Sequence, residues 1–512
     1  MDTSVIRIIV LIFLIQIYVP DPLSAQTASR PGDTAAISML LSKARKTSAD
    51  SAVAICRQAI SIAENNLKKG GSGALMNAFT RKLVKSQLEL GLAYYQNLEY
   101  DKSLDVYQQA LQSATKLGDA FYLGECNFNI AEVYLEQSRF ADAMNFYHQA
   151  LAYYAKAGDK TGEFWSYTGM GIVQKQAGNF GDAILCYNNA LKIAREGKMR
   201  AEEAICYNNL GNVYRRQGEF AKAMESYQKA ITVFRDTKDD DAVSDCLNNI
   251  GNLYLDNGDP FRALDYFKQS LKVALDKGDE YRLIIRYKNL ATAYSDLKDY
   301  DNAAQYLNDA LKLAEKSGDK SFIASCNMLF GKLNADKNDF AIACAYYAKS
   351  VNLYAEIGAK SEQAEALVEL AGSLLSAGKP GEALLSAREA EKLAQQTGSL
   401  KSRLDANLCL AKCYDKSGNP RQAFEYLKQA TELKDSIYSV EKNRTIEEIE
   451  AGFVRSELKK ENETLTQNSL LQKQAIRTKN IIMFLLVASL AMGTALIWLI
   501  FKRIREAKRE TG

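Results

Sequence analysis

Amide and basic side chains recur at a fixed spacing in the middle of this 512-residue chain. An asparagine side chain offers two N–H donors and a carbonyl acceptor, so a row of asparagines can hold an extended peptide backbone without reading its side chains. Arginine and lysine side chains can hold a carboxylate. The candidate ligand-binding residues lie on three successive segments: Asn208, Asn209, Asn212, Arg215 and Arg216, then Asn248, Asn249 and Asn252, then Lys288 and Asn289.

Two interpretations of these asparagines stay open. Asn209, Asn249 and Asn289 occupy one position in successive segments, so their amides could bridge adjacent helices instead of meeting a ligand. Asn212 and Asn252 lie one helical turn further along, and we expect them to face a groove.

Catalytic, metal and nucleic-acid chemistry is not predicted. The chain has no phosphate-binding loop, no G-x-S-x-G and no H-E-x-x-H, and its one histidine, His148, reads as a surface or groove residue. Cys409 and Cys413 are four residues apart and read as two packed thiols, and no His/Cys cluster could hold zinc. The net charge of +3 is nearly balanced, without a basic face. The sequence therefore predicts no enzyme, no metal and no cofactor. One repeated position predicts small core residues: Cys126, Cys206, Cys246 and Cys326.

A repeat of 40 residues must position the polar side chains, since seven alanines stand at multiples of that spacing. Apolar residues recur at helical spacing within each unit, in two runs separated by a break such as Gly218. Gly211 and Gly251 sit where two helices must approach closely, and aromatic residues are expected to fill the space that they leave. The sequence therefore predicts a stack of helical hairpins. The alanines are Ala110, Ala150, Ala190, Ala230, Ala310, Ala390 and Ala430.

Helix ends carry their own signals. A glycine followed by aspartate can close one helix in a left-handed conformation and cap the next. Proline at the start of a helix costs little, because the N–H there has no partner within the helix. The Gly-Asp pairs are at 118–119, 158–159, 278–279 and 318–319, and the prolines are Pro260, Pro380 and Pro420.

This pattern resembles the tetratricopeptide repeat family: a large residue, then Leu-Gly, Tyr, Ala, Phe or Tyr, and Ala. It covers nine consecutive pairs from about Met76 to Ser436, after a degenerate helix at about Ser48 to Leu67. The resemblance implies an all-α, right-handed superhelical solenoid of about nine helix pairs, whose first helices line a concave groove for peptide ligands. The family's common period of 34 and its frequent terminal proline are absent here, as in the members with longer helices.

The two ends of the chain predict export and a membrane anchor. An apolar run from Ile8 to Val19 precedes Pro20 and Pro22 and indicates a signal peptide cleaved after Ala25, with an uncleaved anchor as the alternative. Residues 481–501 carry no charge over 21 residues. As a helix they would be about 31 Å long, enough to cross a bilayer. The basic tail that follows favours a cytoplasmic C-terminus.

The predicted domains follow from these segments. Residues 437–479 are rich in charge and predict a long helix, either a coiled coil or a solvated single helix, so 437–501 could form a homodimer. The sequence divides into a signal peptide (1–25), an N-terminal segment with a capping helix (26–75), the solenoid (76–436), the charged helix (437–479), a transmembrane helix (480–501) and a short basic tail (502–512).

This layout resembles the periplasmic sensor half of bacterial membrane-anchored tetratricopeptide regulators, including histidine kinases with these repeats, without their output domain. The resemblance implies a single-pass protein of the bacterial inner membrane with periplasmic repeats. We expect a non-enzymatic sensor or adaptor that binds a peptide or protein and signals to a separate cytoplasmic kinase or regulator. The alternative is a constitutive scaffold for a cell-envelope complex.

Overall fold

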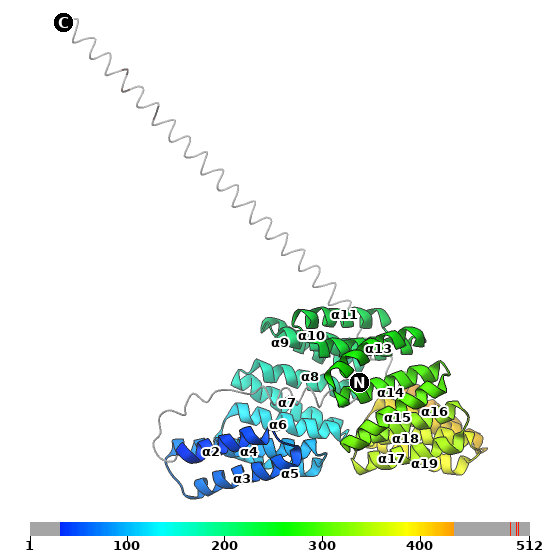
Figure 1. Cartoon of the computed structure of the whole chain (residues 1–512), viewed down its shortest axis with the longest axis horizontal. Helices are drawn as coiled ribbons and strands as arrows, with labels where there is room; N and C mark the ends of the chain where they lie inside the picture. The colour runs from blue at the N-terminus through cyan, green and yellow to red at the C-terminus, as the bar shows by residue number, and fades with distance from the viewer. Residues whose placement is uncertain (1–30, 435–491, 493–497, 499, 501–512) are drawn as a thin grey trace, which may run out of the picture. The chain divides into compact units, whose positions relative to one another are not determined.

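The protein is described by a computed structural model over residues 31–434 and at the single positions 492, 498 and 500. Residues 31–434 form helices joined by short turns, and Figure 1 shows successive helices stacked as neighbours in a curved array. The helices are α2 (Pro31–Ala44), α3 (Ala49–Lys68), α4 (Gly73–Gln96), α5 (Tyr100–Leu117), α6 (Ala120–Glu136), α7 (Phe140–Ala157), α8 (Lys160–Ala177), α9 (Phe180–Glu196), α10 (Arg200–Arg216), α11 (Phe220–Asp236), α12 (Asp240–Asp256), α13 (Pro260–Lys277), α14 (Glu280–Asp296), α15 (Tyr300–Ser317), α16 (Lys320–Asp336), α17 (Phe340–Glu356), α18 (Lys360–Ser376), α19 (Pro380–Thr397) and α20 (Leu400–Lys416).

The predicted all-α solenoid is confirmed, and no strand occurs among the residues that the structure describes. The pairs run from α4 with α5 to α18 with α19, and α20 is followed by a helix over 420–434. At the N-terminal end, α3 lies where a degenerate helix was predicted. The helix α2 before it was not predicted; Ile37 and Leu41 bury its apolar side against α3 and α4.

Close contact between a glycine and an aromatic ring holds the two helices of a pair together. A methyl group placed on Gly211 would lie 2.6 Å from the Tyr227 ring, and one on Gly251 would lie 2.4 Å from the Phe267 ring. Gly91, Gly171 and Gly331 meet Tyr107, Tyr187 and Tyr347 in the same way. The predicted pairing of small and aromatic residues is therefore confirmed in these five pairs, where it sets the distance between the helix axes.

The turns repeat as regularly as the helices. A residue with a left-handed backbone ends helices at intervals of 20, such as Gly258 (φ 75°), Gly278 (φ 65°) and Lys298 (φ 61°). The expected caps are present, since Asp279 accepts a hydrogen bond from the backbone N–H of Arg282 at 3.0 Å. The helices α13 and α19 begin with proline, as expected.

The predicted terminal segments fall outside the described residues. These are the signal peptide (1–25), the charged helix (437–479), the transmembrane helix (480–501, apart from positions 492, 498 and 500) and the tail (502–512). Within the part of the chain that the structure does describe, no helix combines the length and the apolar character needed to cross a bilayer. The chain separates into two compact units, Met1–Tyr438 and Ser439–Gly512, and α2 to α20 all belong to the first.

The solenoid turns far enough for distant repeats to meet. A methyl group on Gly178, just after α8, would lie 3.6 Å from both the Cβ and the backbone N of Lys401 at the start of α20. More than two hundred residues separate these positions along the chain. The concave side of α8 to α14 therefore faces the concave side of α18 and α20.

Candidate functional site

The concave side encloses a cavity of about 410 Å³. The first helices of six repeats line it. They are α8, α10, α12, α14, α18 and α20, and the second helix α17 adds Tyr354. The volume lies within the range of about 300–1,000 Å³ that is typical of ligand sites. Its walls are mainly polar: amides and arginines on one side, serines and carboxylates on the other.

Seven of the ten predicted ligand-binding residues line this cavity. They are Arg215, Arg216, Asn248, Asn249, Asn252, Lys288 and Asn289. Lys288 is partly engaged, since its Nζ donates to the Ser325 hydroxyl at 2.7 Å. Asn252, in contrast, makes no hydrogen bond to any residue in the described part of the chain and remains available.

The other three predicted residues, Asn208, Asn209 and Asn212, do not line the cavity and are buried between helices. The expectation that Asn212 faces the groove is corrected. Its side chain is 2% exposed, and its Oδ1 accepts a hydrogen bond from the Tyr227 hydroxyl at 2.9 Å. The tyrosine that packs on Gly211 thus also satisfies this amide, so the asparagine is held by the core of its own pair.

The asparagines also bridge neighbouring repeats. Asn249 Nδ2 donates to Asn208 Oδ1 at 2.9 Å, and Asn289 Nδ2 donates to Asn248 Oδ1 at 2.7 Å. For Asn249 and Asn289 the bridging interpretation is therefore confirmed, and since both also line the cavity, contact with a ligand stays a prediction. The bridges fix the orientation of amides that line the cavity, so a ligand would meet a preorganised wall.

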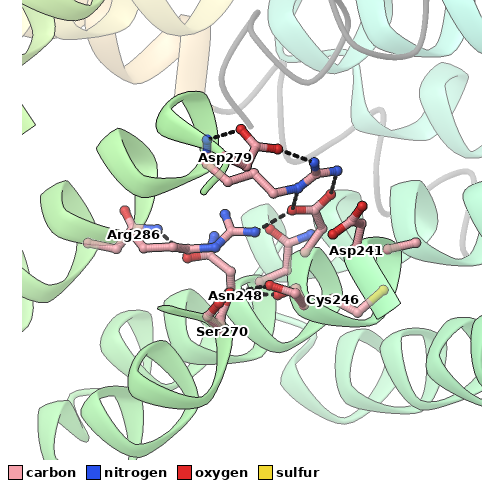
Figure 2. A network of polar contacts seen from close by, with 12 residues as sticks. Asp241, Cys246, Asn248, Ser270, Asp279 and Arg286 are labelled. Atoms are coloured by element: carbon pink, nitrogen blue, oxygen red, sulfur yellow. Dashed lines mark hydrogen bonds and ion pairs between the residues drawn. The ribbon is translucent and has the colours of Figure 1, made fainter. Parts of the chain in front are cut away.

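A network of polar contacts fixes the middle of this wall, and Figure 2 shows it with Asp279 and Arg286 among its labelled residues. The carboxylate of Asp245 on α12 accepts two hydrogen bonds from Arg282, at 3.2 and 3.1 Å, and one from Nη2 of Arg286. Asp279 accepts from Arg282 at 2.6 Å. Burial lowers the pKa of Arg282, but Asp245 and Asp279 outweigh that effect and raise it. The two helices α12 and α14 are therefore locked together beside the cavity.

Arg286 was missed by the sequence reasoning. It is 2% exposed and lines the cavity, yet it stands where the other repeats place Ser86, Cys126, Ser166, Cys206, Cys246, Cys326, Ala366 and Ala406. An arginine in a column of small core residues is the signal that could have found it. A buried guanidinium needs an acidic partner, and the partly exposed Asp245 in the preceding repeat supplies one.

The opposite wall was also missed. It consists of Glu362, Glu365 and Val368 on α18 and Lys401 and Asp405 on α20. Burial raises the pKa of Asp405, Lys401 lowers it, and the nearby Glu365 raises it further. No repeat motif marks these carboxylates. Their relevance comes from the turn of the solenoid, which brings α18 and α20 across from α10 and α12.

Cations crowd the edge of the cavity near α8 and α10. Lys175 is buried, and burial, with Arg216 and Arg215 close by, lowers its pKa to about 7. Burial and the neighbouring Arg215 likewise lower the pKa of Arg216. Arg215 itself pairs with Asp256 on α12. Three basic side chains, Lys175, Arg215 and Arg216, therefore lie close together at this edge.

Two family models, both described as tetratricopeptide repeat, match the chain. One matches residues 83–156, 127–196, 162–236 and 242–316, and the other matches residues 404–436. This chain is a tetratricopeptide repeat protein. None of the curated proteins compared matches it by sequence.

Solved structures resemble the tetratricopeptide repeats of this chain at low identity. A Rap protein complexed with competence and sporulation factor is 14% identical and covers 71% of this chain and 99% of its own, with a TM-score of 0.49. Aspartyl phosphate phosphatase F from Bacillus subtilis is 16% identical, with coverages of 73% and 97% and a TM-score of 0.45. The apo form of the quorum sensor NprR from B. thuringiensis is 14% identical. It covers 69% of this chain and 98% of its own, with a TM-score of 0.42.

The remaining candidate groups lie in or on the tetratricopeptide repeats without forming a site. Cys126, Cys206, Cys246 and Cys326 are buried, as expected of core positions, and Cys409 and Cys413 are free thiols packed in the core. His148 is exposed on α7 and does not line the cavity. Among the described residues, no group of His, Cys, Asp and Glu could hold a metal ion.

Proposed function

We propose that this chain is a non-enzymatic tetratricopeptide repeat protein that binds a peptide, or an extended segment of a protein, in its concave cavity. The observation that carries the proposal is the 410 Å³ cavity lined by polar side chains from successive first helices. Repeat stacks of this kind present extended concave surfaces for binding. A cavity of this volume suits a few residues of chain and is too small for a folded domain.

The chemistry of the wall favours a peptide backbone. Asn252 offers an unused amide, and bridged amides such as Asn249 and Asn289 lie beside it. Each amide can donate to a backbone carbonyl and accept from a backbone N–H. Because consecutive peptide groups present both kinds of partner, amides on neighbouring first helices suit an extended chain.

Anchoring and signalling are further parts of the proposal. The uncharged run 481–501 and the basic tail favour a single span of the bacterial inner membrane, with periplasmic repeats and a cytoplasmic C-terminus. A ligand that bridges repeats would change the curvature of the solenoid and pass this change to a separate partner, such as a cytoplasmic kinase. The chain would then act as a sensor or adaptor in signal transduction.

The test is recovery of ligand by the full-length chain, purified in mild detergent after incubation with envelope extract and read by mass spectrometry. Asn252→Ala and Arg216→Gln should each reduce the recovered peptide or protein about tenfold. The matched controls are Asn188→Ala on α9 and Arg235→Gln on α11, whose side chains are exposed outside the cavity.

Recovery that is equal in all four variants would show that binding does not use the cavity. A bound partner present in constant stoichiometry under every growth condition would favour the scaffold over the sensor. Accessibility of the repeats to protease in spheroplasts tests the periplasmic location separately.

A further inference from the structure

The wall of the cavity formed by α10, α12 and α14 is cationic. Arg215, Arg216, Arg286 and Lys288 line it against one carboxylate, Asp245. Arg215 pairs with Asp256 and Arg286 with Asp245, so two of the four charges are already matched. Arg216 forms no ion pair with any residue in the described part of the chain, and its side chain is exposed to the cavity. A ligand anion would therefore be held best at Arg216.

The wall formed by α18 and α20 is anionic. Glu362, Glu365 and Asp405 line it against one cation, Lys401. Neither Glu365 nor Asp405 makes an ion pair with any residue that the structure describes. The two carboxylates also interact unfavourably, since Glu365 raises the pKa of Asp405. A ligand cation between them would relieve this repulsion.

The cationic and anionic walls face each other across the cavity. Glu365 is near enough to Arg216 to raise the pKa of its guanidinium, but among the described residues neither Arg216, Glu365 nor Asp405 forms an ion pair. The contact between Gly178 and Lys401 brings the walls together at one edge. The enclosed space therefore separates two complementary sets of charge.

From this geometry, and resting on the proposed peptide-binding function, we propose that the cavity selects a short peptide with an anionic and a cationic end. The carboxylate lies at Arg216 and the ammonium group lies between Glu365 and Asp405. The peptide thus spans from α10 to α18 and α20, and the Asn252 amide holds its backbone.

Charge complementarity argues against other ligand classes. A polyanion such as a nucleic acid would meet Glu362, Glu365 and Asp405, and a polyamine would meet Arg216 and Arg286. Placing like charges together in an enclosed site of low dielectric is costly. A zwitterion is the ligand class that matches both walls at once.

The test uses four synthetic pentapeptide libraries, and in the first three all residues are uncharged, so that the termini supply the only charges. The full-length chain is immobilised in mild detergent and offered four libraries at equal concentration: free termini, N-acetylated, C-amidated, and doubly blocked with one aspartate and one lysine. Mass spectrometry quantifies the peptides retained. Roughly tenfold more retention is expected for free termini than for either singly blocked library. The fourth library shows whether the two charges that the cavity binds must be at the peptide termini or can be on side chains.

Four variants assign the two ends. Arg216→Gln should abolish the preference for a free carboxylate and keep the preference for a free amine. Glu365→Gln with Asp405→Asn should do the reverse. The controls Arg235→Gln and Asp265→Asn, on exposed positions of α11 and α13, should behave as the unmodified chain. Circular dichroism and thermal unfolding of each variant show that it is folded.

The outcomes separate this inference from the proposed function. Equal retention of free, acetylated and amidated libraries would overturn the inference while leaving peptide binding in place. A swapped dependence, in which Arg216→Gln alters the preference for the amine, would overturn it as well. Retention of no peptide from any library would remove the proposed function, and the inference with it.

Discussion

Two buried glutamates on α6 couple the stability of the protein to pH. The Tyr154 hydroxyl donates to Glu125 Oε1 at 2.6 Å, and the Tyr147 hydroxyl donates to Glu132 Oε1. Burial raises the pKa of Glu125 to about 7, and burial with the nearby Glu136 raises the pKa of Glu132 to about 8, although each tyrosine lowers it. Both side chains are therefore mostly protonated in the folded protein at pH 6.

Stability should fall as the pH rises from about 5 to about 8. In that window the folded chain holds protons at Glu125 and Glu132 that the unfolded chain has already released, so raising the pH favours unfolding. Glu132→Gln keeps the acceptor for Tyr147 and removes the titration. The substitution should raise the free energy of unfolding at pH 9 by about 2 kcal/mol and leave the free energy of unfolding at pH 5 nearly unchanged.

Urea unfolding at pH 5, 7 and 9 measures this effect, with the exposed Glu315→Gln on α15 as the control. A gain for Glu132→Gln that is the same at all three pH values would contradict the assignment.

Asp245 and Arg286 give a second prediction at this scale. Asp245→Ala removes the acceptor of a buried guanidinium and should cost about 3 kcal/mol. Adding Arg286→Ala, which restores the small residue of other repeats, should recover more than half of that loss. A double-mutant cycle in urea measures the coupling, and additive losses would show that the two side chains do not depend on each other.

Five of the described hairpins pack a glycine on the first helix against an aromatic ring on the second. The glycine is unfavourable for helix formation by about 1 kcal/mol relative to alanine, so packing must outweigh propensity. A methyl group added to Gly211 would lie 2.6 Å from the Tyr227 ring, whereas one added to Gly372 on α18 would have no atom within 4 Å. The same residue type therefore has opposite roles in two first helices.

Gly211→Ala should destabilise the protein by about 2 kcal/mol, because the added methyl group displaces the Tyr227 ring. Gly372→Ala should stabilise it by about 0.5–1 kcal/mol through helix propensity alone. Thermal and urea unfolding compare the two variants. Stabilisation by both would show that the glycine is not required for hairpin packing.

In the left-handed turns, too, the effect of a glycine depends on its position in the repeat. Lys298 (φ 61°) takes the conformation that Gly258 (φ 75°) takes in the preceding repeat. A side chain costs about 1 kcal/mol there. Lys298→Gly should therefore increase the free energy of unfolding by about 0.5 kcal/mol, and Gly258→Ala should decrease it by about 1 kcal/mol. Equal, small effects in urea unfolding would argue against this turn geometry.

At the scale of the whole solenoid, the decisive feature is the approach of α8 to α20. It converts an open groove into a cavity with two walls. The distance of 3.6 Å from an added Gly178 Cβ to the Lys401 Cβ lies within the range for disulfide-linked residues. Gly178→Cys with Lys401→Cys should therefore form a disulfide on mild oxidation.

Peptide mapping under non-reducing conditions identifies the cross-link. Gly218→Cys with Lys401→Cys is the matched control, since Gly218 occupies the same turn one repeat later and should not react. Failure of the first pair under conditions that oxidise an exposed thiol would show that the solenoid does not close in this way. The cross-linked protein should still bind peptide if the cavity is the site.

The sequence by itself determined the local structure. The spacing of 40 residues, the glycines, the aromatic residues and the Gly-Asp pairs specify hairpins that pack on their neighbours, because each signal acts within one or two repeats. The same periodicity predicted that Arg216 and Asn252 face the groove, and both line the cavity. It could not separate Asn212 from Asn252, since both occupy one repeat position and differ only in the partner, Tyr227 or Phe267, that the second helix offers.

Only the tertiary structure decided what faces this surface. Small rotations between successive repeats add up over more than five units until Lys401 meets Gly178, and no local signal reports that sum. Glu365 and Asp405 were therefore invisible as site residues, and Arg286 gained a role only once Asp245 was seen beside it. Helical hairpins are set by contacts between neighbours, whereas the charge across the cavity is set by the curvature of the whole stack.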